Sequence, residues 1–576
     1  MSLTGALHIG NSALTASQLA IQVAGNNMAN AATPGYSRQL AYLSPLRSNT
    51  TGRVSIGMGV RVTDVRRQVD EALLARLNTG IAQEAAAQQR HTLLSQIEST
   101  LGELGDNDLS SEVSKFFGSW SERANLTQSS AVVVQQGQRL ADFMRRLRSD
   151  LTQQRDQLDR QLGVATENAN GVLDQIAQLN QSIADAEAGG GRASTLRDQR
   201  DTLVAQLSES LDATAVEQNN GMVNVLVGST PIVLGARSRG IELVRRSQNG
   251  NLEVSVNVKE DGQQLTIDSG RIGALLSDRD AAISDTIGKL DTMSAQLIFE
   301  VNKLHSTGCN AAGLGGALST LALPTADRTL ALNDPANQSL AGLPFHATSG
   351  GFTVQVKSPT GSTQSVRIDI DLDGRTAAGL PGYGDDTSAE DIRAAVDAID
   401  GLSASFTSDG RLKIDADAGF TFSFADDTSA ALATLGVNAY FTGTNAADIA
   451  VRSDLREQPN LLTTGRMENG TFIENGTALG IAGLQDKPLN ALGDRSIKTW
   501  WIDSAQALGV QTDAAKATAE ATSIVRQSLD AQRLTISGVN IDEESVNLMT
   551  FQRQYQGAAR FITTVDEMMQ TLISIV

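Results

Sequence analysis

The sequence is poor in cysteine and histidine. Cys309 is the only cysteine among 576 residues, which excludes an internal disulfide framework and any metal site built from several cysteines. The four histidines, His8, His91, His305 and His346, are far apart, and none has a second histidine at metal-ligand spacing. We interpret His305, near the end of a predicted helix, as a helix-capping residue. We therefore expect no catalytic residue, no metal site, no cofactor and no enzymatic activity.

Basic clusters and long apolar runs are also missing. The chain has 46 Lys and Arg against 65 Asp and Glu, a formal net charge of -19, and no basic run. Nucleic acids and anionic membranes are bound through clustered Lys and Arg, so we expect neither as a partner. No apolar run approaches the ~18 residues of a membrane-spanning helix, and the N-terminus lacks the features of a cleaved secretion signal. If the protein leaves the cytoplasm, we expect another export route.

The sequence does contain a long amphipathic segment at its C-terminal end. Apolar side chains recur there at an unbroken spacing of three and four, which predicts the seam of an α-helix. The seam consists of Leu548, Phe551, Tyr555, Ala558, Ile562, Val565, Met569, Leu572 and Val576. Further apolar residues beside it widen the face, which favours a helix held by neighbours on more than one side.

The N-terminal thirty residues show a related pattern. Large apolar residues recur every seven positions, with small residues beside them. The large ones are Leu7, Leu14, Ile21 and Met28, and the small ones include Gly10, Ser17 and Ala24. A helix of about 30 residues spans ~45 Å and cannot bury such a stripe against itself. We expect both ends to be poorly ordered alone and to pair in the assembled state; the alternative is a simple hairpin of the two helices within one chain.

The changes of periodicity along the chain predict a multidomain, mainly α fold. It comprises a long helical bundle with a small β region, an inserted α+β domain, and N- and C-terminal amphipathic helices. The predicted parts are a terminal helical domain, 1–40 plus 545–576; a helix-rich domain, 41–310 plus 441–544, with its β region near 213–260; and the inserted α+β domain, 311–440.

One short motif has the spacing of metal ligands. Asp369, Asp371 and Asp373, followed by glycine, are spaced like the start of a calcium loop. The twelfth position is Leu380, where a bidentate Glu is required, and the segment follows a predicted strand instead of a helix. We therefore favour a polar strand end followed by a turn, and binding of a cation by these carboxylates stays open.

Two segments resemble the bacterial flagellar axial proteins, which comprise rod, hook and hook-associated proteins. One is NNMANAATPGYSRQ, starting at Asn26, and the other is SGVNIDEESVNLMTFQRQYQGAARFITTVDEMMQTL, starting at Ser537. Their motif residues are Asn26, Asn27, Asn30, Thr33, Pro34, Gly35, Tyr36, Ser537, Gly538, Val539, Asn540, Asp542, Glu543 and Glu544. Four more segments resemble the hook-associated branch: LRDQRDTLVAQL from Leu196, SGRIGALLSDRD from Ser269, LDTMSAQLIFEVNKLHSTG from Leu290 and LGVNAYFTGTNAADIAV from Leu435.

This resemblance implies a non-enzymatic structural protein at the hook–filament junction, outside the cell after transient residence in the cytoplasm. It implies export through the flagellar type III apparatus. The terminal helices are then the inner tube, packed against further copies of the chain, the hook protein and a second junction protein, hook-associated protein 3. A cytoplasmic export chaperone is expected to cover the C-terminal seam before assembly. The alternatives are another flagellar axial protein, and a secreted adhesin or enzyme that binds through residues 311–440.

Overall fold

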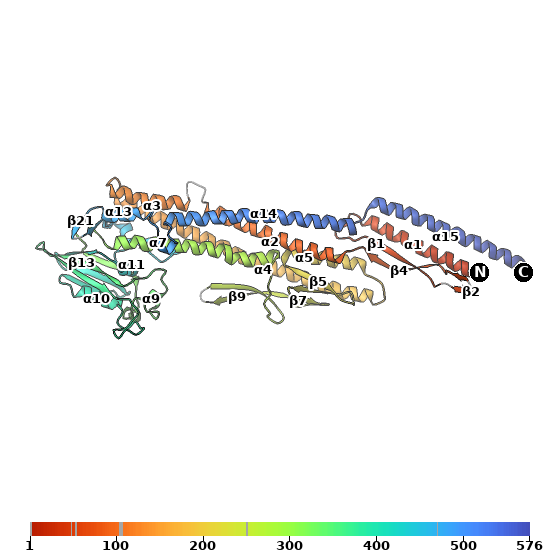
Figure 1. The fold of residues 1–576 in the computed structure, drawn as a ribbon, viewed down its shortest axis with the longest axis horizontal. Coiled ribbons are helices and arrows are strands. Elements are labelled where there is room, and N and C mark those ends of the chain that lie inside the picture. Colours follow the sequence, from red (N-terminus) through yellow and green to blue (C-terminus); the bar gives the residue numbers. More distant parts are fainter. Residues whose placement is uncertain are drawn as a thin grey trace. The chain divides into compact units, whose positions relative to one another are not determined.

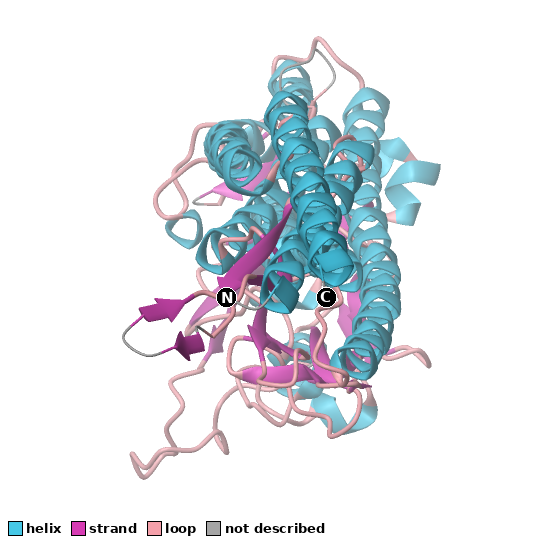
Figure 2. Ribbon diagram, turned by 90° about the vertical axis from the view of Figure 1, so that its right-hand side faces the viewer, coloured by secondary structure: helices cyan, strands magenta, loops and turns pink. Residues whose placement is uncertain are grey.

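The computed structural model describes residues 3–47, 49–51, 54–102, 108–248, 251–468 and 470–575. Helices dominate these residues, and the strands form small separate antiparallel sheets (Figures 1 and 2). The mainly α, multidomain fold class is thereby confirmed. In the part of the chain so described, no helix is both long and apolar enough to cross a membrane.

The chain forms two compact units, each made of several sequence segments. The first comprises Met1–Leu93, Gln157–Arg279 and Asp513–Val576, and the second comprises Leu94–Asp156 and Asp280–Thr512. Three long helices contribute residues to both units: α2 (Glu71–Leu101), α4 (Ser130–Glu187) and α14 (Ile497–Ser537). The division into three parts made from the sequence stays a prediction.

The remaining helices follow the apolar periodicity of the sequence. Those of the first unit are α1 (Leu3–Ala29), α5 (Ser194–Ser210), α6 (Gly270–Asp278) and α15 (Ile541–Ile575). The π-helix η1 (Arg279–Ser284) follows α6 directly. The helices of the second unit are α3 (Leu109–Ala124), α7 (Asp285–Ser306), α8 (Thr325–Arg328), α9 (Gln338–Ala341), α10 (Ala389–Asp397), α11 (Ala431–Leu435), α12 (Ser453–Glu457), η2 (Pro459–Leu461), α13 (Gly476–Gly483) and η3 (Asn490–Leu492).

The strands of the first unit pair antiparallel with close neighbours in the chain. β1 (Gln39–Pro45) pairs with β4 (Val60–Arg67), and between them β2 (Asn49–Thr51) pairs with β3 (Val54–Ile56). A four-stranded sheet has the order β5 (Ala213–Glu217), β6 (Val223–Val227), β7 (Thr230–Leu234) and β8 (Arg237–Ser238), followed by the hairpin of β9 (Ile241–Gln248) and β10 (Asn251–Val258). In β6, Val223, Val225 and Val227 are buried, as the alternation of a strand with one covered face requires.

The described residues of the second unit form four small sheets. Two of the three-stranded sheets have the orders β12 (Gly316–Ala322), β16 (Arg411–Ala416), β15 (Leu402–Phe406), and β14 (Thr363–Ile370), β13 (Gly350–Lys357), β17 (Thr421–Ala425). A further three-stranded sheet has the order β11 (Gly308–Cys309), β20 (Gly465–Glu468), β21 (Thr471–Ile473). The two-stranded sheet pairs β18 (Phe441–Thr442) with β19 (Ala450–Val451). One hydrophobic cluster, with Phe352, Phe422 and Phe424 at its centre, draws its buried residues from Leu323 to Val437. This cluster lies inside the range in which an inserted α+β domain is predicted.

A cluster of aromatic side chains forms a second core in the same unit. Only 4% of the residues are aromatic, yet Phe116, Phe117, Trp120, Tyr440 and Phe441 are all fully buried and touch one another. The Tyr440 and Phe441 ring centroids lie 4.7 Å apart in an edge-to-face arrangement. The Tyr440 hydroxyl donates to a backbone carbonyl of α4 at 2.9 Å and is therefore satisfied. The buried Trp120 Nε1–H has no hydrogen-bond partner among the described residues.

His305 and Cys309 are both buried beside this core. The His305 Nδ1–H donates to the carbonyl of Asn438 at 2.7 Å, and Thr463 is 3.3 Å from Nε2. Burial lowers the pKa of His305 to about 3, so the ring is neutral and the interpretation as a helix-capping charge is wrong. Burial likewise raises the pKa of the Cys309 thiol to about 11.

Candidate assembly interface

The helix α1 turns its small residues toward the rest of its unit. Gly10, Ala16, Ser17, Ala20, Ala24 and Asn27 are its buried residues. The large residues of the predicted heptad, Leu7, Leu14, Ile21 and Met28, are only half-buried. Small side chains permit close packing of two helices, and the large ones beside them keep apolar surface that a single chain does not cover.

Helix α15 lies along α1, and the start of α1 and the end of α15 lie at the same end of this helix pair (Figure 1). Ala558 and Val565 are its buried seam residues. Leu548, Phe551, Ile562 and Met569 are half-buried, Tyr555 and Leu572 are exposed, and Val576 lies outside the described residues. The seam is therefore only partly covered. Apolar side chains beside the seam are also exposed, and Ile573 is 74% exposed.

The two helices approach each other closely at Gly10. A Cβ atom placed there would lie 2.7 Å from Cγ1 of Ile562 and 3.0 Å from a ring carbon of Phe561. A groove of about 470 Å³ runs beside this contact between α1, α15 and the β1–β4 hairpin. Leu43 and Val60 line it from the hairpin, so the groove is apolar along most of its length.

The first turn of α15 is built for a helix start. The Asn540 side-chain oxygen accepts from the N–H groups of Asp542 and Glu543, as an N-cap residue does. Asp542, Glu543 and Glu544 then place three acidic side chains where the helix dipole is positive. The motif residues at this end are thus explained by local helix chemistry, with Ser537 closing α14 and Gly538 and Val539 forming the connection.

Asn27 connects the two family motifs. Its Nδ2 donates to Glu544 Oε2 at 3.1 Å and to the carbonyl of Gln39 at 2.9 Å. Its Oδ1 accepts from the Gln39 N–H at 3.0 Å and from the Tyr36 hydroxyl at 2.9 Å. All four hydrogen-bonding positions of the amide are used, and the residue is only 1% exposed. Glu544 is separated from Asn27 by 517 positions, so this contact closes the chain on itself.

Arg38 reinforces the same contact from the other side of Glu544. Its NH2 lies 2.7 Å from Glu544 Oε1 and its NH1 lies 3.1 Å from Glu543 Oε2. Its backbone N–H donates to the carbonyl of Ser537 at 2.9 Å. Burial, together with the nearby Asp198 and Glu544 carboxylates, raises the pKa of Tyr36 to about 12, so the phenol stays protonated.

A third family-like segment, on α5, meets the N-terminal motif. The Ser37 N–H donates to Asp198 at 3.3 Å, and Arg67 of β4 binds Asp198 at 2.8 Å and Asp201 at 2.7 Å. Gly35 has φ +77°, and a Cβ there would meet the hydroxyl oxygen of Thr202 at 2.5 Å. Only glycine fits this turn, which explains its place in the motif.

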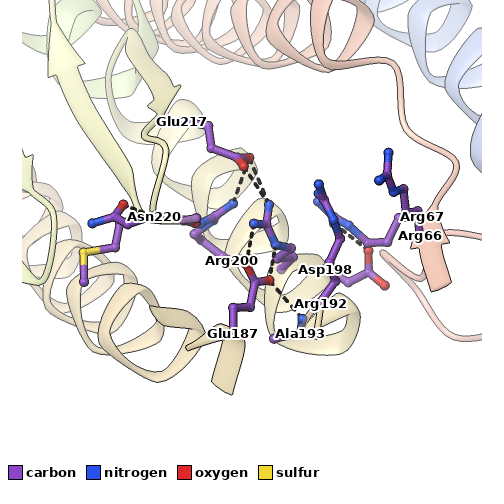
Figure 3. A network of polar contacts seen from close by, with 12 residues as sticks. Arg66, Arg67, Glu187, Arg192, Ala193, Asp198, Arg200, Glu217 and Asn220 are labelled. Carbon is purple, nitrogen blue, oxygen red and sulfur yellow. Dashed lines mark hydrogen bonds and ion pairs between the residues drawn. The ribbon is translucent and has the colours of Figure 1, made fainter. Parts of the chain in front are cut away.

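The charges of α5 continue into a network with the β5–β6 hairpin (Figure 3). Arg197 donates to Glu187 at 2.7 Å and to Glu217 at 2.9 Å, and the bonds to Glu187 raise its pKa above the usual range. Arg200 is 1% exposed and donates to the carbonyl of Gly221 at 2.7 Å. This network ties the end of α4, α5 and the sheet together, and so supports the motif contact at Asp198.

Two other family-like segments meet in the second unit. Asn302 of α7 accepts from the N–H groups of Tyr440 and Phe441, both at 2.9 Å. In the opposite direction, the side-chain amide of Asn438 donates to the carbonyls of His305 and Gly308, both at 3.1 Å. The sequence shows these segments as separate stretches, and it contains no pattern that pairs them.

The remaining motif residues have local or exposed positions. The Asn26 side-chain amide donates to the Tyr36 hydroxyl, and the Asn30 amide donates to the Asn26 side chain. Thr33 lies in the exposed turn that follows α1. Pro34 belongs to the same turn. Asn27 and Glu544 both belong to the sequence motifs, but no sequence pattern pairs them, and none identifies Arg38, Arg67 and Asp198 as partners. Arg38 and Asp198 stand inside the quoted segments, but their types alone do not identify partners far apart in sequence.

Two family models match the chain. Residues 94–318 match the model described as "Flagellar hook-associated protein FlgK helical domain", and residues 531–575 match "Flagellar basal body rod FlgEFG protein C-terminal". The solved structure of the flagellar hook junction protein FlgK from Burkholderia pseudomallei is similar with a TM-score of 0.48 and 14% identity, covering 80% of this chain and 100% of that one.

Curated relatives align along almost the whole sequence. The chain is 24% identical to flagellar hook-associated protein 1 of Escherichia coli (strain K12), and the match covers 98% of each chain. It is also 24% identical to the protein of that name from Bacillus subtilis (strain 168), over 99% of this chain and 97% of the relative. These relatives are structural proteins of the flagellum and not enzymes. The chain is thus similar to flagellar hook-associated protein 1 over nearly its whole length, and its residues 94–318 match the helical domain of the FlgK proteins.

Proposed function

We propose that this protein is the adaptor that joins hook to filament. In this proposal residues 1–40 and 545–576 form an inner tube with the same helices of neighbouring copies. Residues 41–310 with 441–544 form a helix-rich domain, and residues 311–440 form an inserted α+β domain. The observation that carries the proposal is the incomplete burial of α1 and α15. They pair through small residues and leave large apolar side chains uncovered beside a groove of about 470 Å³.

The proposed partners follow from this uncovered surface. Further copies of the chain, the hook protein and hook-associated protein 3 supply the apolar surfaces that cover it on assembly. A cytoplasmic chaperone covers the α15 seam before export through the flagellar type III apparatus, because an exposed apolar face of this length favours premature association. The protein then acts outside the cell, at the hook–filament junction, through packing alone.

The position of the protein on intact flagella tests the proposal. A tagged chain, located by immunogold electron microscopy, is expected as one discrete band at the distal end of the hook. A uniform distribution along the filament would instead favour another axial protein. A distribution over the cell surface without a flagellar band would favour an adhesin that uses residues 311–440.

Substitutions in α15 test the role of packing. Ile562→Asp places a charge in the seam next to Gly10, and Ile573→Asp places one on a side chain that is 74% exposed in the single chain. Both are expected to abolish incorporation into the flagellum while far-UV circular dichroism shows a nearly unchanged total helix content. Thr563→Asp is the matched control, because Thr563 is exposed on the polar face. Normal filament growth from both Ile variants would refute the packing role.

A further inference from the structure

Three carboxylates of the second unit converge at the end of β14. One oxygen from each of Asp371, Asp373 and Asp386 lies within 4.8 Å of the other two. Backbone pairing brings them together: the Thr387 N–H donates to the carbonyl of Asp371 at 2.8 Å, and the Asp371 N–H donates to the Thr387 hydroxyl at 2.9 Å. Asp386 therefore supplies the distant carboxylate that is missing at Leu380 in the calcium-loop reading of the sequence.

The described part of the chain supplies no ion-pair partner for these three carboxylates. Throughout the described ranges, no lysine, arginine or histidine forms an ion pair with Asp371, Asp373 or Asp386. Asp369, the fourth acidic residue of the motif, behaves differently: its side chain is 82% exposed and pairs with Arg367 at 2.8 Å. Close carboxylates repel each other, and a cation bound between them would relieve this repulsion.

Asp386 gives a second and independent indication. It is only 5% exposed, so its carboxylate is almost completely removed from water. Oδ2 accepts from the Gly374 N–H at 3.0 Å and from the side-chain amide of Asn333 at 2.6 Å. Oδ1 is buried and has no hydrogen-bond partner among the residues that the structure describes. A buried carboxylate oxygen without a donor is costly unless a cation binds it.

We propose that Asp371, Asp373 and Asp386 form a calcium site. Calcium takes six to eight oxygen ligands in flexible geometry, often including water, and three carboxylates with one open, exposed side suit it. Asp371 and Asp373 are exposed while Asp386 is buried, so the ion would sit at the surface with its inner side held by Asp386. The site does not depend on the proposed junction role, and its failure would leave that role untouched.

Calorimetry and thermal unfolding of the full chain test the site. Titration of CaCl₂ into the metal-free protein is expected to release binding heat with a Kd in the range of ~10⁻⁴ to 10⁻³ M, as in extracellular calcium modules. Calcium at about 100 times Kd is expected to raise the melting temperature, because it binds the folded state only. Asp371→Asn and Asp373→Asn are each expected to weaken binding at least about tenfold.

Both substitutions keep the local fold. The Asp371 and Asp373 oxygens accept from the N–H groups of Asp373 and Arg375, and an Asn oxygen accepts equally well. Asp369→Asn is the matched control: it removes the same charge from the same segment and is expected to leave calcium binding unchanged. Absence of calcium binding by the native chain, or equal binding by all three variants, would overturn the proposal. A response to MgCl₂ with none to CaCl₂ would overturn the assignment to calcium.

Discussion

At the scale of single residues, the amide of Asn27 carries much of the contact between the two ends of the chain. It meets Gln39, Tyr36 and Glu544 with four hydrogen bonds inside a nearly water-free site. A buried polar group that loses its partner costs about 1–3 kcal/mol, more than the net gain of an ordinary hydrogen bond. The geometry of this contact therefore depends on all of the residues that bond to Asn27.

Asn27→Ala is expected to loosen this contact. It leaves the Gln39 N–H and the buried Glu544 carboxylate without one partner each, at about 1–3 kcal/mol for each group. The measurement is hydrogen exchange at the Gln39 amide, which should become much faster. Asn30→Ala is the control, because Asn30 bonds only to the exposed Asn26 and Thr33. Equal effects of the two substitutions would show that the buried cluster is unimportant.

His305 is expected to stay neutral from pH 8 to pH 4. Its folded pKa of about 3 lies below the ~6.5 of an unfolded chain, so the unfolded state binds more protons between these values. The stabilisation is complete above pH ~6.5 and is lost as pH falls toward 3, by at most ~1.4 kcal/mol per pH unit. In ring-proton NMR spectra, the resonance that His305→Ala removes should not titrate in this range. A midpoint near pH 6 for that resonance would contradict a buried ring.

Residue types in the sequence identify some of these roles and not others. Gly35 and Asn540 are recognisable from local rules, because a turn needs glycine and a helix start needs a capping side chain. The helix-capping interpretation of His305 failed because burial depends on the aromatic residues that surround it in the fold, which come from distant segments. The pairing of Asn27 with Glu544 is missed for the same reason.

At the scale of elements, α1 and α15 pair through their small residues. The heptad of large residues on α1 suggests that Leu7 and Leu14 make the contact, but the buried positions are Gly10, Ser17 and Ala24. Periodicity predicts that a face is apolar, and it does not decide which part of a wide face a neighbouring helix covers. The same holds for α15: Tyr555 and Leu572 belong to the predicted seam, but they are exposed in the single chain.

Two glycine substitutions on α1 are expected to act in opposite directions. Gly10→Ala places a Cβ 2.7 Å from Ile562, and overpacking of this kind costs about 1–3 kcal/mol. Gly25→Ala meets no atom within 4 Å, so only the helix propensity of alanine counts, and it stabilises by about 0.5–1 kcal/mol. Hydrogen exchange of α1 and α15 amides measures both effects. Stabilisation by both substitutions would mean that the helices do not approach closely at Gly10.

At the scale of the whole molecule, the net charge of -19 opposes the packing of many copies. The screening length falls from ~30 Å at ~0.01 M salt to ~10 Å at ~0.1 M, which weakens repulsion between copies without weakening apolar contacts. Self-association of the purified chain is therefore expected to increase with salt over this range. Sedimentation velocity measures it, with Ile562→Asp as the non-associating control. Association that decreases with salt would indicate ion pairs instead of apolar contacts.

The composition and periodicity of the sequence were enough to predict the mainly α class. The positions of the two compact units were not predictable, because α2, α4 and α14 continue through both and the sequence marks no break inside them. The proximity of Asp371 and Asp386 could not be predicted from the sequence either. It depends on a backbone contact at Thr387 that no spacing rule describes.

The sealed position of Cys309 has a practical consequence for all of these experiments. Its thiol is buried, and a pKa of about 11 leaves almost no reactive thiolate at neutral pH. Maleimide reagents should not react with the Cys309 thiol in the folded chain. A cysteine introduced on an exposed turn then becomes the sole attachment point for a dye or gold particle, without prior removal of a native residue.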